Sequence, residues 1–218
     1  MRFADRKQAG DVLAQRLLRY RDDPAVVVLA LPRGGVPVAF EVAQTLHAPL
    51  DVFIVRKLGL PGHEEFAMGA IATGGVMVMN PDLASVHIPE AAIEDVVARE
   101  RIELDRRERL YRGDRGPLPI EDHTVILVDD GLATGSTMLA AATAVRRQHP
   151  KRIVVAVPVA AMETCRSFHS VVDEVVCAVT PEPFLAVGAW YENFGQTSDA
   201  EVHALLDMAG ERDADRAA

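Results

Sequence analysis

Five short and almost entirely apolar segments recur along the chain, and longer stretches with the periodicity of a helix separate them. The apolar segments cover residues 26–31, 51–55, 124–129, 152–158 and 172–178. Strands that are apolar on both faces are typical of a parallel sheet that helices cover on both sides. The helical stretches cover residues 5–20, 37–47, 136–148, 161–169 and 199–208. This alternation predicts an α/β fold built from right-handed strand–helix–strand units.

One region, residues 56–112, interrupts the alternation. Its first part is rich in glycine and predicts a loop followed by a hairpin, with AMGAIA and VMVMN as the strands. Residues 90–112 predict one long helix that starts near Pro89, with mixed charges that indicate a solvated face. The alternative is that some of its arginines face a neighbouring subunit or an anionic ligand. We expect a single domain over residues 1–209, with 56–112 as an inserted lobe and 210–218 as a disordered tail.

The charge balance narrows the class of partner. The chain has 32 acidic and 23 basic side chains, for a formal net charge of −9. This balance argues against duplex DNA or an anionic membrane as the main partner, since both select for basic surfaces. The apolar runs are shorter than the roughly 20 residues that a membrane span needs, and the N-terminal segment lacks the apolar core of a signal peptide. Only three of the basic residues are lysines, namely Lys7, Lys57 and Lys151.

Two cysteines, Cys165 and Cys177, both lie in apolar stretches. Two cysteines are too few for a disulfide scaffold, and their spacing is too wide for a compact zinc pair. We therefore expect both to be buried, reduced thiols. Reduced thiols fit a cytoplasmic protein, because disulfides persist mainly in oxidising compartments.

The segment with the most chemical information is VILVDDGLATGST, residues 125–137. A buried strand ends in two carboxylates, Asp129 and Asp130, and a loop of small residues leads directly into an apolar helix. Converging backbone N–H groups and the helix dipole make such a loop a phosphate site. The carboxylates suit a sugar, whose vicinal hydroxyls donate hydrogen bonds to them, so the spacing fits a ribose 5-phosphate. The loop lacks the Gly-Lys-Ser/Thr ending of a Walker A motif; the other reading is an ordinary turn with two capping acids.

This segment resembles the phosphoribosyl pyrophosphate (PRPP) signature of the type I phosphoribosyltransferases, and the resemblance extends over residues 26–195. It implies the type I fold, in which a central, mostly parallel five-stranded sheet has helices on both faces and carries a flap or hood lobe. It also implies that Asp129 and Asp130 bind the ribose. The loop residues that would hold the 5-phosphate are Gly131, Ala133, Thr134, Gly135, Ser136 and Thr137.

Two further segments resemble loops of the same family. ALPRGGVPVA (residues 30–39) is similar to the first pyrophosphate loop, which implies PRPP contacts at Arg33, Gly34 and Gly35 and a cis peptide bond at Pro32–Arg33. VRKLGLPGHEE (residues 55–65) is similar to the start of the mobile flap. This second resemblance implies that Lys57 contacts the pyrophosphate, with Arg56 beside it.

The segment TPEPFLAVGAWYENF, residues 180–194, is similar to the part of the family that holds the base. The resemblance implies that Phe184 stacks on the acceptor ring, that Val187 lines its pocket and that Glu192 stands near Mg²⁺. The lysine with which purine-specific members read a 6-oxo group has no counterpart in VPVAAMET, which puts hypoxanthine and guanine in doubt. A purely structural role is the alternative for three neighbouring aromatic residues, Trp190, Tyr191 and Phe194.

The whole pattern is most similar to predicted bacterial phosphoribosyltransferases of unassigned substrate, which share PRGGVPVA, RKLG, VDDGLATGST and WYxxFxQTxD. The resemblance implies a pentosyltransferase of nucleotide salvage that uses Mg²⁺, with Asp129, Asp130 and Lys57 as catalytic residues and a homodimer or larger homo-oligomer as the assembly. One alternative is a PRPP-sensing regulator or inactive relative that acts through a protein partner. Another is a hydrolase or kinase of sugar phosphates, for which the chain offers no P-loop, G-x-S-x-G or HExxH motif.

Overall fold

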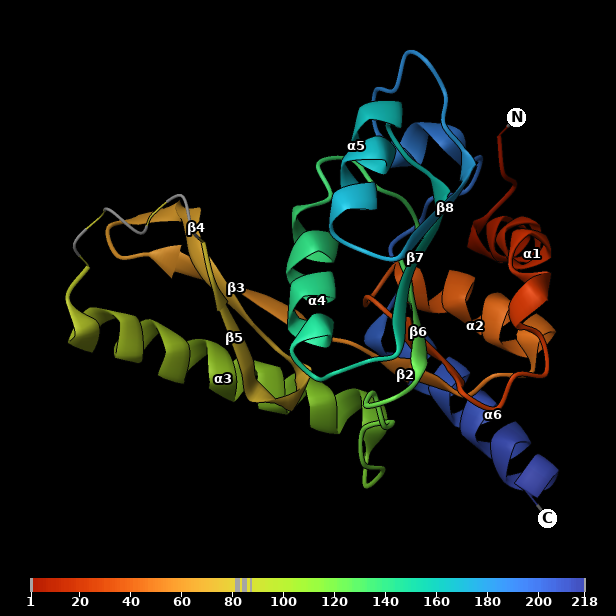
Figure 1. Cartoon of the computed structure of the whole chain (residues 1–218), viewed down its shortest axis with the longest axis horizontal. Helices are drawn as coiled ribbons and strands as arrows, with labels where there is room; N and C mark the ends of the chain where they lie inside the picture. Colours follow the sequence, from red (N-terminus) through yellow and green to blue (C-terminus); the bar gives the residue numbers. More distant parts are fainter. Residues whose placement is uncertain (1, 81–82, 84–85, 87, 218) are drawn as a thin grey trace.

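Two separate sheets organise the chain in the computed structural model, which describes residues 2–80, 83, 86 and 88–217 (Figure 1). The central sheet has five parallel strands in the order β2-β1-β6-β7-β8, as the apolar segments predicted. Its strands are β1 (Val26–Ala30), β2 (Leu50–Val52), β6 (Thr124–Val128), β7 (Arg152–Val159) and β8 (Glu174–Val179).

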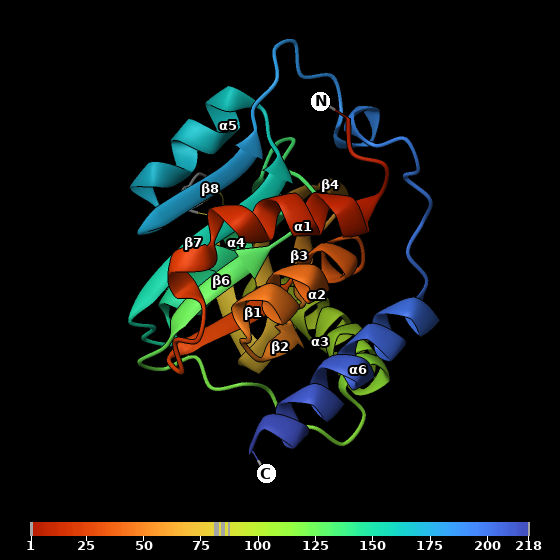
Figure 2. The ribbon, with the colours of Figure 1, turned by 90° about the vertical axis from the view of Figure 1, so that its right-hand side faces the viewer.

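Helices cover both faces of this sheet. They are α1 (Arg6–Arg16), α2 (Gly35–Leu46), α4 (Ser136–Arg146), α5 (Met162–Ser167) and α6 (Asp199–Ala217), with short 3-10 helices η1 (Leu18–Tyr20), η2 (Thr73–Gly75), η4 (Phe168–Ser170) and η5 (Val187–Trp190). Figure 2 shows α1 and α2 across one face, where Val28 and Ile126 belong to the same apolar cluster as these helices and α6. Val27 and Leu127 face the opposite cluster with α4. Alternate strand residues are therefore buried on opposite sides, which explains why β1 and β6 are almost entirely apolar.

The second sheet and a long helix form an arm that extends away from the central sheet (Figure 1). The arm consists of β3 (Val55–Leu60), β4 (His63–Ala72), β5 (Val76–Met79) and α3 (Glu90–Arg112). The predicted β4–β5 hairpin and the predicted long helix are confirmed. The predicted loop is wrong at its start, because residues 55–60 form β3, antiparallel to β4. The glycines of this segment are typical of a loop, but here they belong to the hairpin of β3 and β4. Gly59 lies at a register shift between the two strands, and Gly62 forms the turn between them with a φ of 81°.

A buried ion pair attaches α3 to the central sheet. The Arg112 Nε atom lies 2.9 and 2.8 Å from the two carboxylate oxygens of Asp51 in β2, and its NH2 donates to Val52 O at 2.8 Å. Arg112 is 6% exposed and Asp51 5% exposed. Other α3 arginines follow the predicted solvated pattern; Arg106, for example, pairs with Glu103 on the surface. Arg112 is thus the member of this charged helix that has a structural role at the junction.

The expectation of a disordered C-terminal tail is wrong for the residues that the structure describes. Residues 210–217 continue α6 and do not form a disordered tail. The Arg115 side chain donates to Leu206 O at 2.8 Å and pairs with Asp207, which anchors α6 from outside the helix. Arg212 lies over the Phe40 ring of α2, with 5.7 Å between Cζ and the ring centroid. Among the described residues, no helix combines the length and the apolarity needed to cross a membrane.

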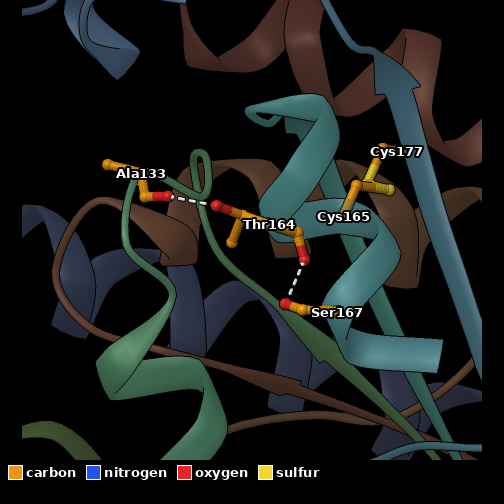
Figure 3. The surroundings of a disulfide bond; sticks show 5 residues. All are labelled: Ala133, Thr164, Cys165, Ser167 and Cys177. Atoms are coloured by element: carbon orange, nitrogen blue, oxygen red, sulfur yellow. Dashed lines mark hydrogen bonds between the residues drawn. A yellow bond between two sulfur atoms is a disulfide. The ribbon is translucent and has the colours of Figure 1, made fainter. Parts of the chain in front are cut away.

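The cysteines correct a third expectation. Cys165 of α5 and Cys177 of β8 form a disulfide bond and are not two buried thiols (Figure 3). No local pattern in the sequence pairs them, but the return of the chain from α5 through η4 into β8 brings their Cα atoms to 6.7 Å. The expectation of a cytoplasmic location therefore loses the support that reduced thiols had lent it.

Removing this disulfide is expected to lower stability without changing the fold. The bond joins residues 12 positions apart, and closing a loop of that size in the unfolded chain stabilises a protein by about 2–4 kcal/mol. Urea unfolding of the Cys165→Ser/Cys177→Ser double variant checks this expectation. Reductant should bring the wild type to the same midpoint and leave the double variant unchanged. Equal midpoints for the oxidised wild type and the double variant would contradict the linkage.

Candidate active site

The loops that follow β1, β6 and β7 meet at one edge of the central sheet. Parallel strands deliver their carboxyl ends to the same edge, which is where open α/β sheets bind ligands. Backbone hydrogen bonds join these loops: Leu31 N donates to Val128 O at 2.8 Å, and Leu132 N donates to Val159 O at 2.9 Å. The structure therefore brings the predicted first loop and the predicted acidic segment together.

The first loop lies in direct contact with the acidic pair. A Cβ atom on Gly34 would lie 2.1 Å from Asp130 Oδ2, and one on Gly35 would lie 2.9 Å from Asp129 Cα. Gly34 has φ −60° and ψ −30°, which any residue adopts. Close approach to the carboxylates, rather than an unusual backbone angle, is therefore what requires glycine at position 34. The Pro32–Arg33 peptide bond is cis, as the family resemblance implied.

Burial raises the pKa of both carboxyl groups of the acidic pair. The pKa of Asp129 is raised well above its usual range, first by burial and then by the negative charge of Asp130. Burial also raises the pKa of Asp130, while the charge and hydrogen bonds of Arg6 lower it. Arg6 Nε and NH2 each lie 2.9 Å from Asp130 Oδ2. Sequence reasoning missed Arg6, because no motif or spacing links a residue at the start of α1 to the loop after β6.

The loop into α4 has the features of an anion site. Gly135 is the N-cap of α4 with a φ of 73°, and no side chain of the described residues caps the helix. The first N–H groups of α4 are therefore open to an acceptor, with the positive end of the helix dipole behind them. Thr164 Oγ1 donates to Ala133 O at 2.7 Å and supports the loop from α5 (Figure 3). The hydroxyl groups of the loop belong to Thr134, Ser136 and Thr137.

The predicted basic residues are placed differently from one another. Lys57 of β3 donates to Ser136 Oγ at 3.1 Å, so the arm reaches the start of α4. A cavity of about 410 Å³ lies there between the arm and α4, and Lys57 and Thr137 are among the residues that line it. Arg56 lines the same cavity and donates twice to Glu100 Oε2 of α3, at 2.9 and 2.6 Å. Arg33 lies 3.8 Å from Asp199 at the start of α6.

The predicted base-side residues lie in and around a small apolar cluster. Phe184 and Val187 pack against this cluster, which includes Phe3 and Tyr191. Val187 also contacts the acidic loop, since a Cβ on Gly131 would lie 2.6 Å from Val187 Cγ1. The structure thus brings Val187 to the loop that carries the acidic pair and packs Phe184 against the neighbouring cluster.

Three other residues of this segment had open roles. Tyr191 is 1% exposed, and its hydroxyl donates to Asp130 O at 2.6 Å. Phe194 packs under the Arg6 guanidinium, so neither aromatic residue is remote from the acidic pair. Glu192 is exposed, and its backbone N–H donates to Phe3 O. Within residues 2–80, 83, 86 and 88–217, no group of three or more His, Cys, Asp or Glu side chains is arranged to hold a metal ion by itself.

Known proteins are similar to this chain over most of its length. Residues 4–179 match the family model described as the phosphoribosyl transferase domain. The chain is 49% identical over 208 residues to a predicted phosphoribosyl transferase of Mycobacterium tuberculosis, and the match covers 95% of this chain and 47% of the relative. The chain therefore spans about half the length of this curated relative. The crystal structure of TT1426 from Thermus thermophilus is also similar, with a TM-score of 0.84 and 45% identity over 94% of this chain and 98% of that one.

Proposed function

The chain belongs to the phosphoribosyl transferase family, and from this premise we propose that it binds PRPP with Mg²⁺ and transfers the 5-phosphoribosyl group to a nitrogenous base or amine, releasing pyrophosphate. The observation that carries the proposal is the contact between the loop after β1 and the loop that joins β6 to α4, at one edge of the central sheet. A glycine loop, an acidic pair and an uncapped helix N-terminus lie together, and they match the three chemical parts of PRPP.

Each part of the candidate site has a role in this reaction. The 5-phosphate accepts hydrogen bonds from the start of α4 and from the loop hydroxyls, which fixes the sugar. Asp129 and Asp130 accept hydrogen bonds from the ribose 2- and 3-hydroxyls. The backbone at Gly34 and Gly35, together with Lys57, holds the diphosphate as it leaves. The C1–O bond to pyrophosphate breaks and a C1–N bond forms with inversion, and the two carboxylates stabilise the positive charge that develops on the sugar.

The donor chemistry at the sheet edge fits Mg²⁺. This ion prefers oxygen ligands and is commonly held by one or two carboxylates together with substrate phosphates. PRPP would provide most of the oxygens through its diphosphate and its ribose hydroxyls, and Glu192 is the protein carboxylate that would stand near the ion. When bound, the ion supplies positive charge that offsets the negative charge of the diphosphate.

The arm and the segment after β8 complete the proposal. Lys57 of the arm contacts the start of α4, and closure of the arm over bound PRPP would exclude water and so limit the competing hydrolysis of PRPP. Val187 and Phe184 form the acceptor side. Phe66 and Ile102 of the arm are 61% and 72% exposed, which supports the arm as the contact in a homo-oligomer. We place the reaction in the cytoplasm, since a phosphorylated sugar does not cross a bilayer and is used where it is made.

Calorimetric titration of PRPP, with and without Mg²⁺, tests this function. We expect saturable binding that Asp130→Asn weakens by at least about tenfold, because a hydrogen bond to a charged group contributes about 1.5–3 kcal/mol. Asp114→Asn, which changes an exposed aspartate, should bind as the wild type does. The absence of binding at millimolar PRPP would contradict the proposal. Binding without pyrophosphate release, across a panel of bases and amines, would favour a PRPP-sensing regulator.

A further inference from the structure

Two segments far apart in the sequence pair beside the acidic pair. Phe3 N donates to Trp190 O and Glu192 N donates to Phe3 O, both at 2.8 Å, and Asn193 N donates to Ala4 O at 2.9 Å. The rings of Phe3 and Tyr191 are buried together, with centroids 5.5 Å apart. We call residues 2–6 and 190–195 the clasp. Most of the clasp lies outside residues 4–179, the part that matches the family model.

The clasp holds the guanidinium of Arg6 in one position. Its Nε and NH2 atoms lie 2.9 Å from Asp130 Oδ2, its NH1 donates to Gly195 O at 2.6 Å, and its Cζ lies 4.1 Å from the Phe194 ring centroid. The Arg6 side chain is 13% exposed. The planar guanidinium group has several N–H donors, which can bind Asp130 and Gly195 at the same time. A lysine ammonium is a point charge and cannot make the same set of contacts.

The stability of α1 does not account for a cation at this position. Arg6 is the first residue of α1, where the helix dipole favours acidic side chains. Asp5 caps the helix by accepting from Gln8 N at 2.8 Å, so α1 begins without help from Arg6. The contacts of the Arg6 guanidinium serve Asp130 and the clasp.

The two carboxylate oxygens of Asp130 have different surroundings. Oδ2 is bound by Arg6, and the backbone oxygen accepts from the Tyr191 hydroxyl at 2.6 Å. Oδ1 accepts no hydrogen bond from any other residue that the structure describes. One carboxylate oxygen is thus fixed by a neighbouring side chain, and the other is left for a ligand.

We propose that Arg6 is a positioning residue, which clamps Oδ2 of Asp130 so that Oδ1 is presented to a ribose hydroxyl. This inference rests on the proposed function. The groups that face Asp130 are Arg6 from α1, Asp129 beside it and the hydroxyl of Tyr191. Among these, Arg6 is the one that lowers the pKa of Asp130 against the effect of burial. Without Arg6, Asp130 takes up its proton at higher pH and loses its charge for the sugar.

The pH dependence of PRPP binding by Arg6→Ala tests the proposal. We expect binding at least about tenfold weaker than the wild type at about pH 6, with part of the loss recovered when the pH is raised to about 8.5, because a higher pH favours the ionised carboxyl. A purely structural role would weaken binding equally at both pH values. Arg2→Ala is the matched control, since Arg2 donates to Tyr191 O in the clasp but does not contact Asp130.

A second variant keeps the test decisive if Arg6→Ala folds poorly. Arg6→Lys keeps the charge but loses the planar guanidinium group, so its pH dependence should follow the wild type while its affinity stays lower. Wild-type affinity and pH dependence in Arg6→Ala, with Asp130→Asn still impaired, would overturn the role of Arg6 and leave the proposed function standing. No PRPP binding by the wild-type chain at any pH would overturn both.

Discussion

Replacing Gly34 by alanine is expected to lower PRPP binding and turnover by at least about 100-fold while the fold is retained. The new Cβ would lie 2.1 Å from Asp130 Oδ2 and 2.8 Å from Asp130 Cγ, so the carboxylate or the loop must move by about an ångström. A displacement of that size at reacting groups costs about 100-fold in rate. The backbone of Gly34 is already in the right-handed helical region, so alanine adds no backbone strain.

Gly116→Ala is the matched control, because a Cβ on Gly116 would meet no atom within 4 Å. Isothermal titration with PRPP and a pyrophosphate-release assay should separate the two variants. Circular dichroism should show the same fold for both. If Gly34→Ala bound PRPP as well as Gly116→Ala did, the contact between the first loop and Asp130 would have no part in ligand binding.

Replacing Arg112 by alanine is expected to give the largest loss of stability, about 3–5 kcal/mol. The change leaves the Asp51 carboxylate buried without its partner and removes the donor to Val52 O. A buried charge that loses its partner costs far more than a surface pair, for which the median contribution is about 0–1 kcal/mol.

Urea unfolding of Arg112→Ala and Arg106→Ala compares the two situations within the same helix. Arg106 pairs with Glu103, and its side chain is 57% exposed, so its removal should change the free energy of unfolding by no more than about 1 kcal/mol. A similarly small change for Arg112→Ala would mean that water reaches Asp51 and compensates its charge.

Local patterns in the sequence predicted most of the central sheet and half of the candidate site. Strands β1 and β6 are almost continuous apolar runs because both of their faces are buried, and this property is visible without any contact information. The segment from Asp129 to Thr137 was equally visible, because strand, loop and helix start are consecutive in the chain. The β4–β5 hairpin and α3 also followed from local periodicity.

The features that were missed depend on contacts between distant residues. The ion pair of Arg56 with Glu100, which lies in a helix 44 positions later, had no signal in the sequence. The contact of Arg115 with Leu206 O of α6 joins residues 91 positions apart, and the disulfide depends on how the chain returns from α5 into β8. Arg6 belongs to the same class, since its partners are 124 and 189 positions away. Spacing within a motif cannot report such pairs.

The pairing of the segments around Phe3 and Tyr191 also determines when this part of the structure can form during synthesis. Arg6 and Gly195 are separated by 189 positions, so their contact forms only after residue 195 has been made. All five strands of the central sheet precede residue 180 and can associate earlier. The entropy lost on closing so long a loop is recovered only when both partners are already held in place. The corner that contains Arg6 is therefore a late product of folding, completed on a sheet that is already assembled.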